Sequence, residues 1–144
     1  MMFESIKLEW LRRPWWMNLI WFFCLYMTFI YMPFDIFTKP FEEWEEVWFG
    51  FVLTGWPAKL TEPLHWLIYA GGAYGFWQMK SWLWPWAALY SAQVTIAMLL
   101  WGYFDGRGLT PAAFVGGPMF LLLTIALWRS KGLFDPDSSA PTDV

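Results

Sequence analysis

Residues 15–32 read WWMNLIWFFCLYMTFIYM, a run of 18 residues without a charged side chain. As an α-helix this run would be about 27 Å long, close to the thickness of the hydrocarbon core of a bilayer. Basic residues precede it as they would in a signal peptide, but no cleavage site of small residues follows. We therefore interpret it as a retained signal anchor, which spans a membrane and ends at Pro33.

Three further apolar runs follow, each preceded by residues that typically begin a helix. Thr61, Ser81 and Thr110 are predicted N-caps, with Pro63, Pro85 and Pro111 in the respective first turns. The four predicted spans are residues 15–32, 64–79, 82–104 and 111–128. The sequence therefore predicts an all-α membrane protein, a four-transmembrane-helix bundle over residues 1–134, with a disordered polar tail over residues 135–144.

The composition agrees with a membrane protein. Of the 144 residues, 58% are hydrophobic and 15% are charged, against about 25% charged in soluble domains. A soluble domain of this size could not hide so much apolar surface. The net charge of −3 argues against nucleic-acid binding. Because Cys24 and His65 are the only residues of their kinds, one chain cannot form a Cys/His zinc site, and we predict neither a metal nor a cofactor.

The distribution of lysine and arginine predicts the orientation. Four spans place one group of cations on the side that holds both termini: Lys7, Arg12, Arg13, Lys80, Arg129 and Lys131. Of the 14 tryptophans, only Trp21 lies well inside a predicted span, and the rest would form belts at the two membrane interfaces. We therefore predict an integral protein of the bacterial inner membrane with both termini in the cytoplasm.

Small residues predict which spans pack together. Gly71 and Gly75 form a GxxxG pair, and Ala88 and Ala92 form a matching stripe on the next span. Glycine lets helix backbones approach closely, so we expect an antiparallel hairpin of these two spans; packing of the pair against another subunit is the alternative. In the last span, Pro118 predicts a kink that shapes the bundle.

The loop between the first two spans is acidic and aromatic. Residues 41–51 read FEEWEEVWFGF, with aromatic side chains at 41, 44, 48 and 51. This spacing is typical of a helix, so we predict a short amphipathic segment on the outer surface. The following GFVLTGWP stretch, residues 50–57, is apolar enough to dip into the membrane where protein covers its backbone.

The topology places several polar residues at the outer end. We expect five of them to converge there: Asp35, Glu62, His65, Asp105 and Arg107. A histidine with carboxylates can carry out acid–base chemistry or bind a metal, but we prefer caps and ion pairs that close the bundle. Gln93 is the most polar side chain near the middle of a span. We expect it to form an interhelical hydrogen bond rather than to recognise a ligand.

In outline the chain resembles the EXPERA group of sterol isomerases and their relatives. Those are also small multi-helix proteins with an acidic residue near the end of an early span, and Asp35 in Met-Pro-Phe-Asp matches that position. Their second acid, within a span, has no counterpart here. The resemblance is one of shape, and function has to be argued from the site itself.

Two functions from different classes fit these features. The absence of a catalytic motif and the large apolar surface favour a non-catalytic accessory, stabilising or assembly subunit of a larger membrane complex, or a homo-oligomer. The alternative is a binder, carrier or enzyme for a hydrophobic molecule such as a quinone, a sterol-like lipid or an acyl chain. Aromatic walls with a few polar groups at one end are typical of such pockets.

Overall fold

The structure is a computed structural model that describes residue 7 and residues 10–134, and it is mostly helical. The first limb contains α2 (Trp15–Tyr26), a π-helical turn (Met27–Tyr31) and α3 (Met32–Thr38). A 3-10 turn (Phe41–Glu43) and two strands, β1 (Glu45–Trp48) and β2 (Phe51–Thr54), lead into α4 (Trp56–Gln78). The second half contains α5 (Leu83–Phe104), a π-helical turn (Ala112–Gly116), α6 (Gly117–Arg129) and a final 3-10 turn (Lys131–Phe134). The predicted tail, residues 135–144, lies outside the described residues.

Three helices in the described part of the chain are long and apolar enough to cross a membrane: Trp15–Thr38, Leu83–Phe104 and Ala112–Arg129. This confirms apolar helices at three of the four predicted positions. The remaining helix, α4, has 23 residues but is more polar, because its first two turns contain Lys59 and Glu62. The four-span arrangement therefore stays a prediction.

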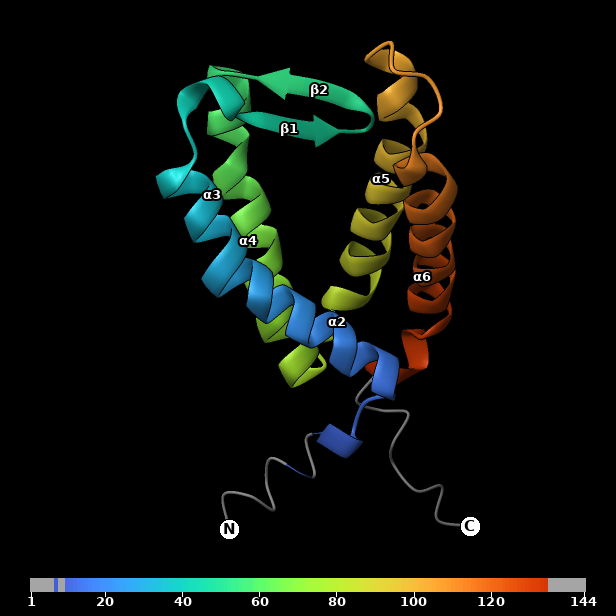
Figure 1. Ribbon diagram of the computed structural model, residues 1–144. Helices are drawn as coiled ribbons and strands as arrows, with labels where there is room; N and C mark the ends of the chain where they lie inside the picture. The colour runs from blue at the N-terminus through green and yellow to red at the C-terminus, as the bar shows by residue number, and fades with distance from the viewer. Residues whose placement is uncertain (1–6, 8–9, 135–144) are drawn as a thin grey trace, which may run out of the picture.

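The helices form two pairs that diverge from a common narrow end (Figure 1). The α2–α3 limb packs along α4, and α5 packs along α6. The short turn between α4 and α5 lies at the narrow end, and the hairpin of β1 and β2 bridges the wide end. Phe134 contacts Phe76 at the end of α4, with ring centroids 6.1 Å apart, so the last described turn also lies at the narrow end. Two cavities lie in the interior between the pairs.

The prediction that Pro33 ends the first helix is wrong. The helix continues to Thr38 because a π-helical turn, Met27–Tyr31, precedes the proline. The wider turn changes the backbone hydrogen-bond ladder locally, and Pro33 then occupies the first turn of α3, where a missing N–H is tolerated. Pro118 is accommodated in the same way, in the first turn of α6 after the π turn Ala112–Gly116. The extension of the first helix carries Asp35 into the site.

The predicted beginning of α4 and the predicted N-caps also need correction. Helix α4 begins at Trp56 with Pro57 in its first turn, so Thr61 and Pro63 lie inside it. The Thr61 hydroxyl donates to backbone carbonyls of the preceding turn instead of capping the helix. Neither Ser81 nor Thr110 caps a helix through its side chain. Pro63 was the misleading signal, because it lies more than one turn after the true beginning of α4 at Trp56.

The acidic and aromatic loop after α3 forms a β-hairpin, and the predicted amphipathic helix is wrong. Glu45 pairs with Thr54 and Trp48 with Phe51 in an antiparallel register. The two-residue turn consists of Phe49 and Gly50, with φ of 51° and 93°, the left-handed conformations that tight hairpin turns require. A Cβ on Gly50 would lie 2.8 Å from Cβ of Leu100, so the turn rests directly on α5. Alternation in the strand places Glu46 and Trp48 on the same face.

The predicted contact of the second and third spans through Gly71, Gly75, Ala88 and Ala92 is largely wrong. No atom lies within 4 Å of a Cβ built on Gly71, whereas a Cβ on Gly72 would lie 2.9 Å from the Cys24 sulfur of α2. Only Gly75 approaches α5, with its Cβ position 2.9 Å from Leu83 at the narrow end. The glycine-rich face of α4 packs against α2, because α4 and α5 diverge from their connecting turn.

Candidate functional site

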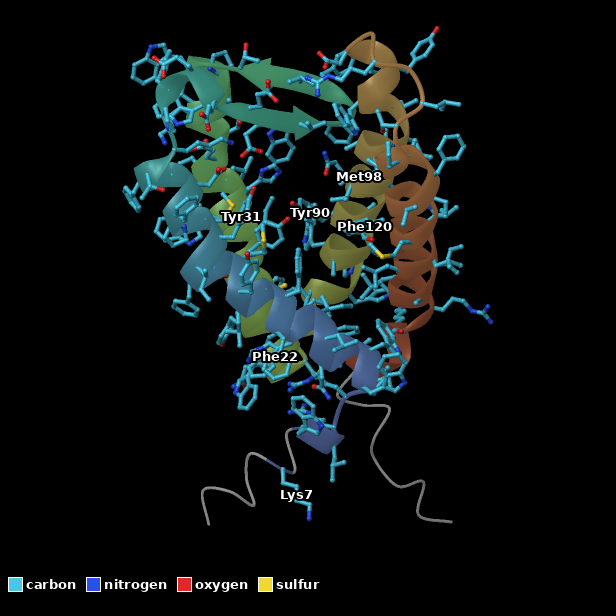
Figure 2. All side chains as sticks on the ribbon, viewed as in Figure 1. Lys7, Phe22, Tyr31, Tyr90, Met98 and Phe120 are labelled. Carbon is cyan, nitrogen blue, oxygen red and sulfur yellow. The ribbon has the colours of Figure 1, made fainter. Side chains whose placement is uncertain are left out.

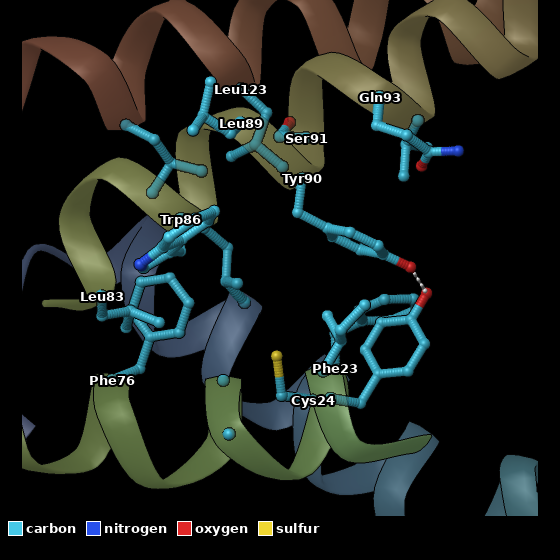
Figure 3. A pocket seen from close by; sticks show the side chains of 18 of the residues that line it. Phe23, Cys24, Phe76, Leu83, Trp86, Leu89, Tyr90, Ser91, Gln93 and Leu123 are labelled. Carbon is cyan, nitrogen blue, oxygen red and sulfur yellow. Dashed lines mark hydrogen bonds between the residues drawn. The ribbon is translucent and has the colours of Figure 1, made fainter. Parts of the chain in front are cut away.

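A large apolar cavity lies between the two helix pairs (Figure 3). Its volume is about 530 Å³, and side chains from α2, the hairpin, α4, α5 and α6 line it. The lining is almost wholly apolar, with Phe23, Phe76, Trp86 and Leu123 among the contributing residues. Leu67 and Trp86 line the cavity and are also 70% and 66% exposed. The cavity is therefore open sideways, between side chains that would face lipid in a membrane.

A second cavity of about 410 Å³ lies under the hairpin and is more polar. Tyr31 from the first limb and Tyr90 and Met98 from α5 stand on its opposite walls (Figure 2). Asp35 and Glu46 line it as well. The two cavities share four lining residues, which we call the waist: Tyr69, Tyr90, Gln93 and Val94. The two cavities therefore border on the same side chains, and the acids lie on the far side of the waist from the apolar cavity.

Three buried carboxylates meet beside the polar cavity. Oxygen atoms of Asp35, Glu46 and Glu62 lie within 4.8 Å of one another, and Glu62 is fully buried. Each carboxylate is paired with a basic side chain. The paired atoms are Lys39 Nζ and Asp35 Oδ1 at 3.2 Å, Lys59 Nζ and Glu62 Oε2 at 3.1 Å, and His65 Nδ1 and Glu46 Oε2 at 2.6 Å. Carboxylates of this kind bind hard cations in other proteins. Because each carboxylate here is already paired with a basic side chain, we interpret the group as a salt-bridge network.

Carboxylates outnumber lysines in this network. Three carboxylates carry three negative charges, against which Lys39 and Lys59 supply two positive charges. Burial alone would lower the pKa of Lys39, but the hydrogen bond and the charge of Asp35 outweigh it and raise that pKa overall. Lys39 therefore stays charged at neutral pH, and by formal charge the three carboxylates exceed the two lysines by one. An anionic group would be repelled from this end of the cavity.

The hairpin positions the imidazole of His65. Its ring stacks on Trp48, with centroids 4.1 Å apart and planes inclined by 12°. Trp48 and the histidine's partner Glu46 stand two residues apart on β1, so one strand face supplies both the stack and the carboxylate. Tyr90 approaches the same ring edge-on from α5, with centroids 6.1 Å apart. His65 is therefore held from both halves of the molecule.

Of the five residues predicted to converge, Asp35, Glu62 and His65 come together, and Glu46 links them. Asp105 and Arg107 do not join them. They pair with each other at 2.6 Å, Arg107 lies over the Trp101 ring, and neither lines the two cavities. Gln93 forms none of the hydrogen bonds found among the described residues, so its predicted interhelical bond is wrong. Five further residues of this region were not predicted from the sequence: Lys39, Glu46, Lys59, Tyr69 and Tyr90.

Comparison with family models, with curated proteins and with solved structures finds no match to this chain. The resemblance in outline to the EXPERA group is thus not accompanied by a family match. The function has to be inferred from the side chains of the two cavities.

Proposed function

We propose that the protein crosses a membrane four times and binds a hydrophobic small molecule in the cavity between its helix pairs. One observation carries this proposal: an apolar cavity, open sideways, borders a polar cavity across the four residues of the waist. Volumes of about 300–1,000 Å³ with apolar walls and a few polar groups are typical of small-molecule sites. The chain or ring system would fill the apolar cavity and the polar end would face the hairpin.

The charges support a membrane orientation with the narrow end in the cytoplasm. Lys80 lies in the turn between α4 and α5, and Lys131 lies over the Trp84 ring at the same end. Arg13 bonds to the last carbonyls of α4 there. Excess cations mark the cytoplasmic side, so the hairpin would face outward. The charged first turns of α4 would then lie at the outer interface, and residues 64–78 would form the span, in a membrane we take to be a bacterial inner membrane.

Single cysteines introduced in a Cys24→Ala background should report this topology. We expect Lys7→Cys and Lys131→Cys to be protected from a membrane-impermeant maleimide in intact cells, and Glu43→Cys and Arg107→Cys to react. Permeabilised cells provide the control, in which all four positions should react. Reaction of position 131 in intact cells, or protection of position 43, would contradict the four-span arrangement.

Filling the apolar cavity should abolish binding without unfolding the protein. The Cβ position of Gly71 has no atom within 4 Å, although the residue lines the cavity. We expect Gly71→Leu to reduce copurified hydrophobic molecules on the order of tenfold, while the melting temperature stays the same or rises because glycine weakens a helix by about 1 kcal/mol. Native mass spectrometry and solvent extraction after purification in mild detergent provide the measurement.

The control for this variant changes the outer face of the same helix. Tyr74→Leu alters a side chain that is 56% exposed and does not line the cavity, so binding should persist. A Gly71→Leu protein that retains its full complement of copurified molecules would contradict the proposal. The same spectra test the accessory-subunit interpretation, which requires a protein partner at fixed stoichiometry in place of a small molecule.

A further inference from the structure

Hydrogen-bond donors without acceptors gather at and beside the waist between the two cavities. The indole Nε1 of Trp48 and the amide Nε2 of Gln93 are buried and have no hydrogen-bond partner among the described residues. The hydroxyls of Tyr69 and Tyr90 lie 3.2 Å apart and bond to each other. That bond uses one of their two hydrogens, so a third donor is left over. Figure 3 shows Tyr90, its bond and Gln93 on the cavity wall, and Trp48 lines the same cavity.

These donors, when they lack an acceptor, lower the stability of the fold. A buried donor without an acceptor destabilises a fold, and nearly all such groups in folded proteins are paired. Apolar side chains make up nearly all of the wall of the apolar cavity, and Glu46, the carboxylate on the same strand face as Trp48, is paired with His65. Donors at the border of an otherwise apolar cavity are what a site for an oxygen acceptor requires, because a hydrocarbon chain leaves them unsatisfied.

We infer that the waist recognises the carbonyl oxygen of an uncharged amphiphile, such as a ketone, a quinone or an ester, with Trp48 and Gln93 as the donors. This inference rests on the proposed function and specifies its ligand. A carbonyl oxygen has two lone pairs and brings no hydrogen of its own, so it can accept from two donors at once. A carboxylate would also accept, but it would approach the three acids of the network, whose charge exceeds that of the two lysines.

The test compares probes that differ by one functional group. Dodecanophenone and dodecylbenzene have the same carbon skeleton and differ only in a carbonyl in place of a methylene; 4-dodecylbenzoic acid supplies the anion. Binding to the full chain in nanodiscs is measured by titration calorimetry and corrected for partition into empty nanodiscs. We expect the ketone to bind on the order of tenfold more tightly than the hydrocarbon, because only the ketone satisfies the donors. The acid should bind more weakly than the ketone.

Matched variants locate the preference. Trp48→Phe keeps an aromatic ring against His65 and removes the N–H, and Gln93→Met keeps the side-chain length and removes the amide. Each should lower the ketone-to-hydrocarbon ratio severalfold, chiefly because the ketone binds more weakly. Trp86→Phe is the control, because Trp86 lines the apolar cavity but is not among the buried indoles without a partner, so the ratio should persist. Melting temperatures of all variants verify that each is folded.

The outcomes separate this inference from the proposed function. Equal affinity for ketone and hydrocarbon in the unmodified protein would overturn the carbonyl preference and leave hydrophobic binding intact. A preference that survives both Trp48→Phe and Gln93→Met would overturn the assigned donors. Tighter binding of the acid than of the ketone would overturn the uncharged class. Absence of binding by all three probes would overturn the inference together with the proposed function.

Discussion

Replacing Arg13 with methionine is expected to lower the free energy of unfolding by about 3 kcal/mol or more, one of the two largest losses we expect from a single substitution. Arg13 is 4% exposed. Its Nη1 donates to the carbonyls of Phe76 and Trp77 at 2.8 and 2.9 Å, and its Nε donates to Asn18 at 2.8 Å. Methionine fills much of the space but leaves these acceptors unsatisfied, and each buried polar group without a partner costs about 1–3 kcal/mol.

The same arginine joins two helices electrostatically. It lies over the rings of Trp21 of α2 and Trp77 of α4, 5.4 and 5.2 Å from their centroids, and its charge sits at the negative end of the α4 dipole. Thermal unfolding in detergent, with Arg129→Met as the exposed control, measures the loss. A melting temperature for Arg13→Met equal to that of the control would show that the contact at the end of α4 contributes little.

The second large effect is expected at Lys59. Its ammonium group pairs with the fully buried Glu62, donates to the carbonyl of Ile36, and lies 3.8 Å from the centroid of the Trp44 ring. Lys59→Met leaves a buried carboxylate without its basic partner, which typically costs about 3–5 kcal/mol. We therefore expect a protein that is strongly destabilised at neutral pH and partly restored at acidic pH, where the carboxyl group of Glu62 becomes protonated.

A double substitution isolates the pair. Lys59→Met combined with Glu62→Leu removes both charges, and a buried ion pair replaced by apolar residues is often neutral in stability. The double variant should therefore be more stable than Lys59→Met alone, with thermal unfolding of the four proteins completing the cycle. If the double variant is no more stable than Lys59→Met, Glu62 is not the group that needs the lysine.

Apolar runs predicted the positions of three helices well, because a stretch of apolar residues long enough to cross a bilayer can be recognised from the local sequence alone. The boundaries of α5 differ from the predicted 82–104 by one residue. Prolines were less informative, since a π turn lets the chain pass Pro33 and Pro118 without ending a helix. Such turns depend on the tertiary setting and have no short sequence pattern that would identify them in advance.

The site was predictable only in part. Asp35, Glu62 and His65 were singled out because topology alone places them near one end, whereas their mutual contact depends on the hairpin. Two signals for that hairpin were present but outweighed by helical spacing: Phe49-Gly50 at its turn, and the β-branched residues Val47 and Val52 in the strands. The pairing of α4 with α2 could not be predicted, because small residues in a helix indicate that another helix packs closely but not which helix it is.

The strand that supplies Glu46 and Trp48 also limits which insertions and deletions the protein can tolerate. Successive side chains of a strand point to opposite faces, so inserting or deleting one codon between Trp44 and Glu46 would reverse both residues together. His65 would lose its carboxylate and its stacking partner in one mutational step. Length changes that occur in pairs, or within the Phe49-Gly50 turn, would preserve the alternation. Insertions and deletions within the strand should therefore be retained in even numbers of residues, because only these keep Glu46 and Trp48 on the face that meets His65.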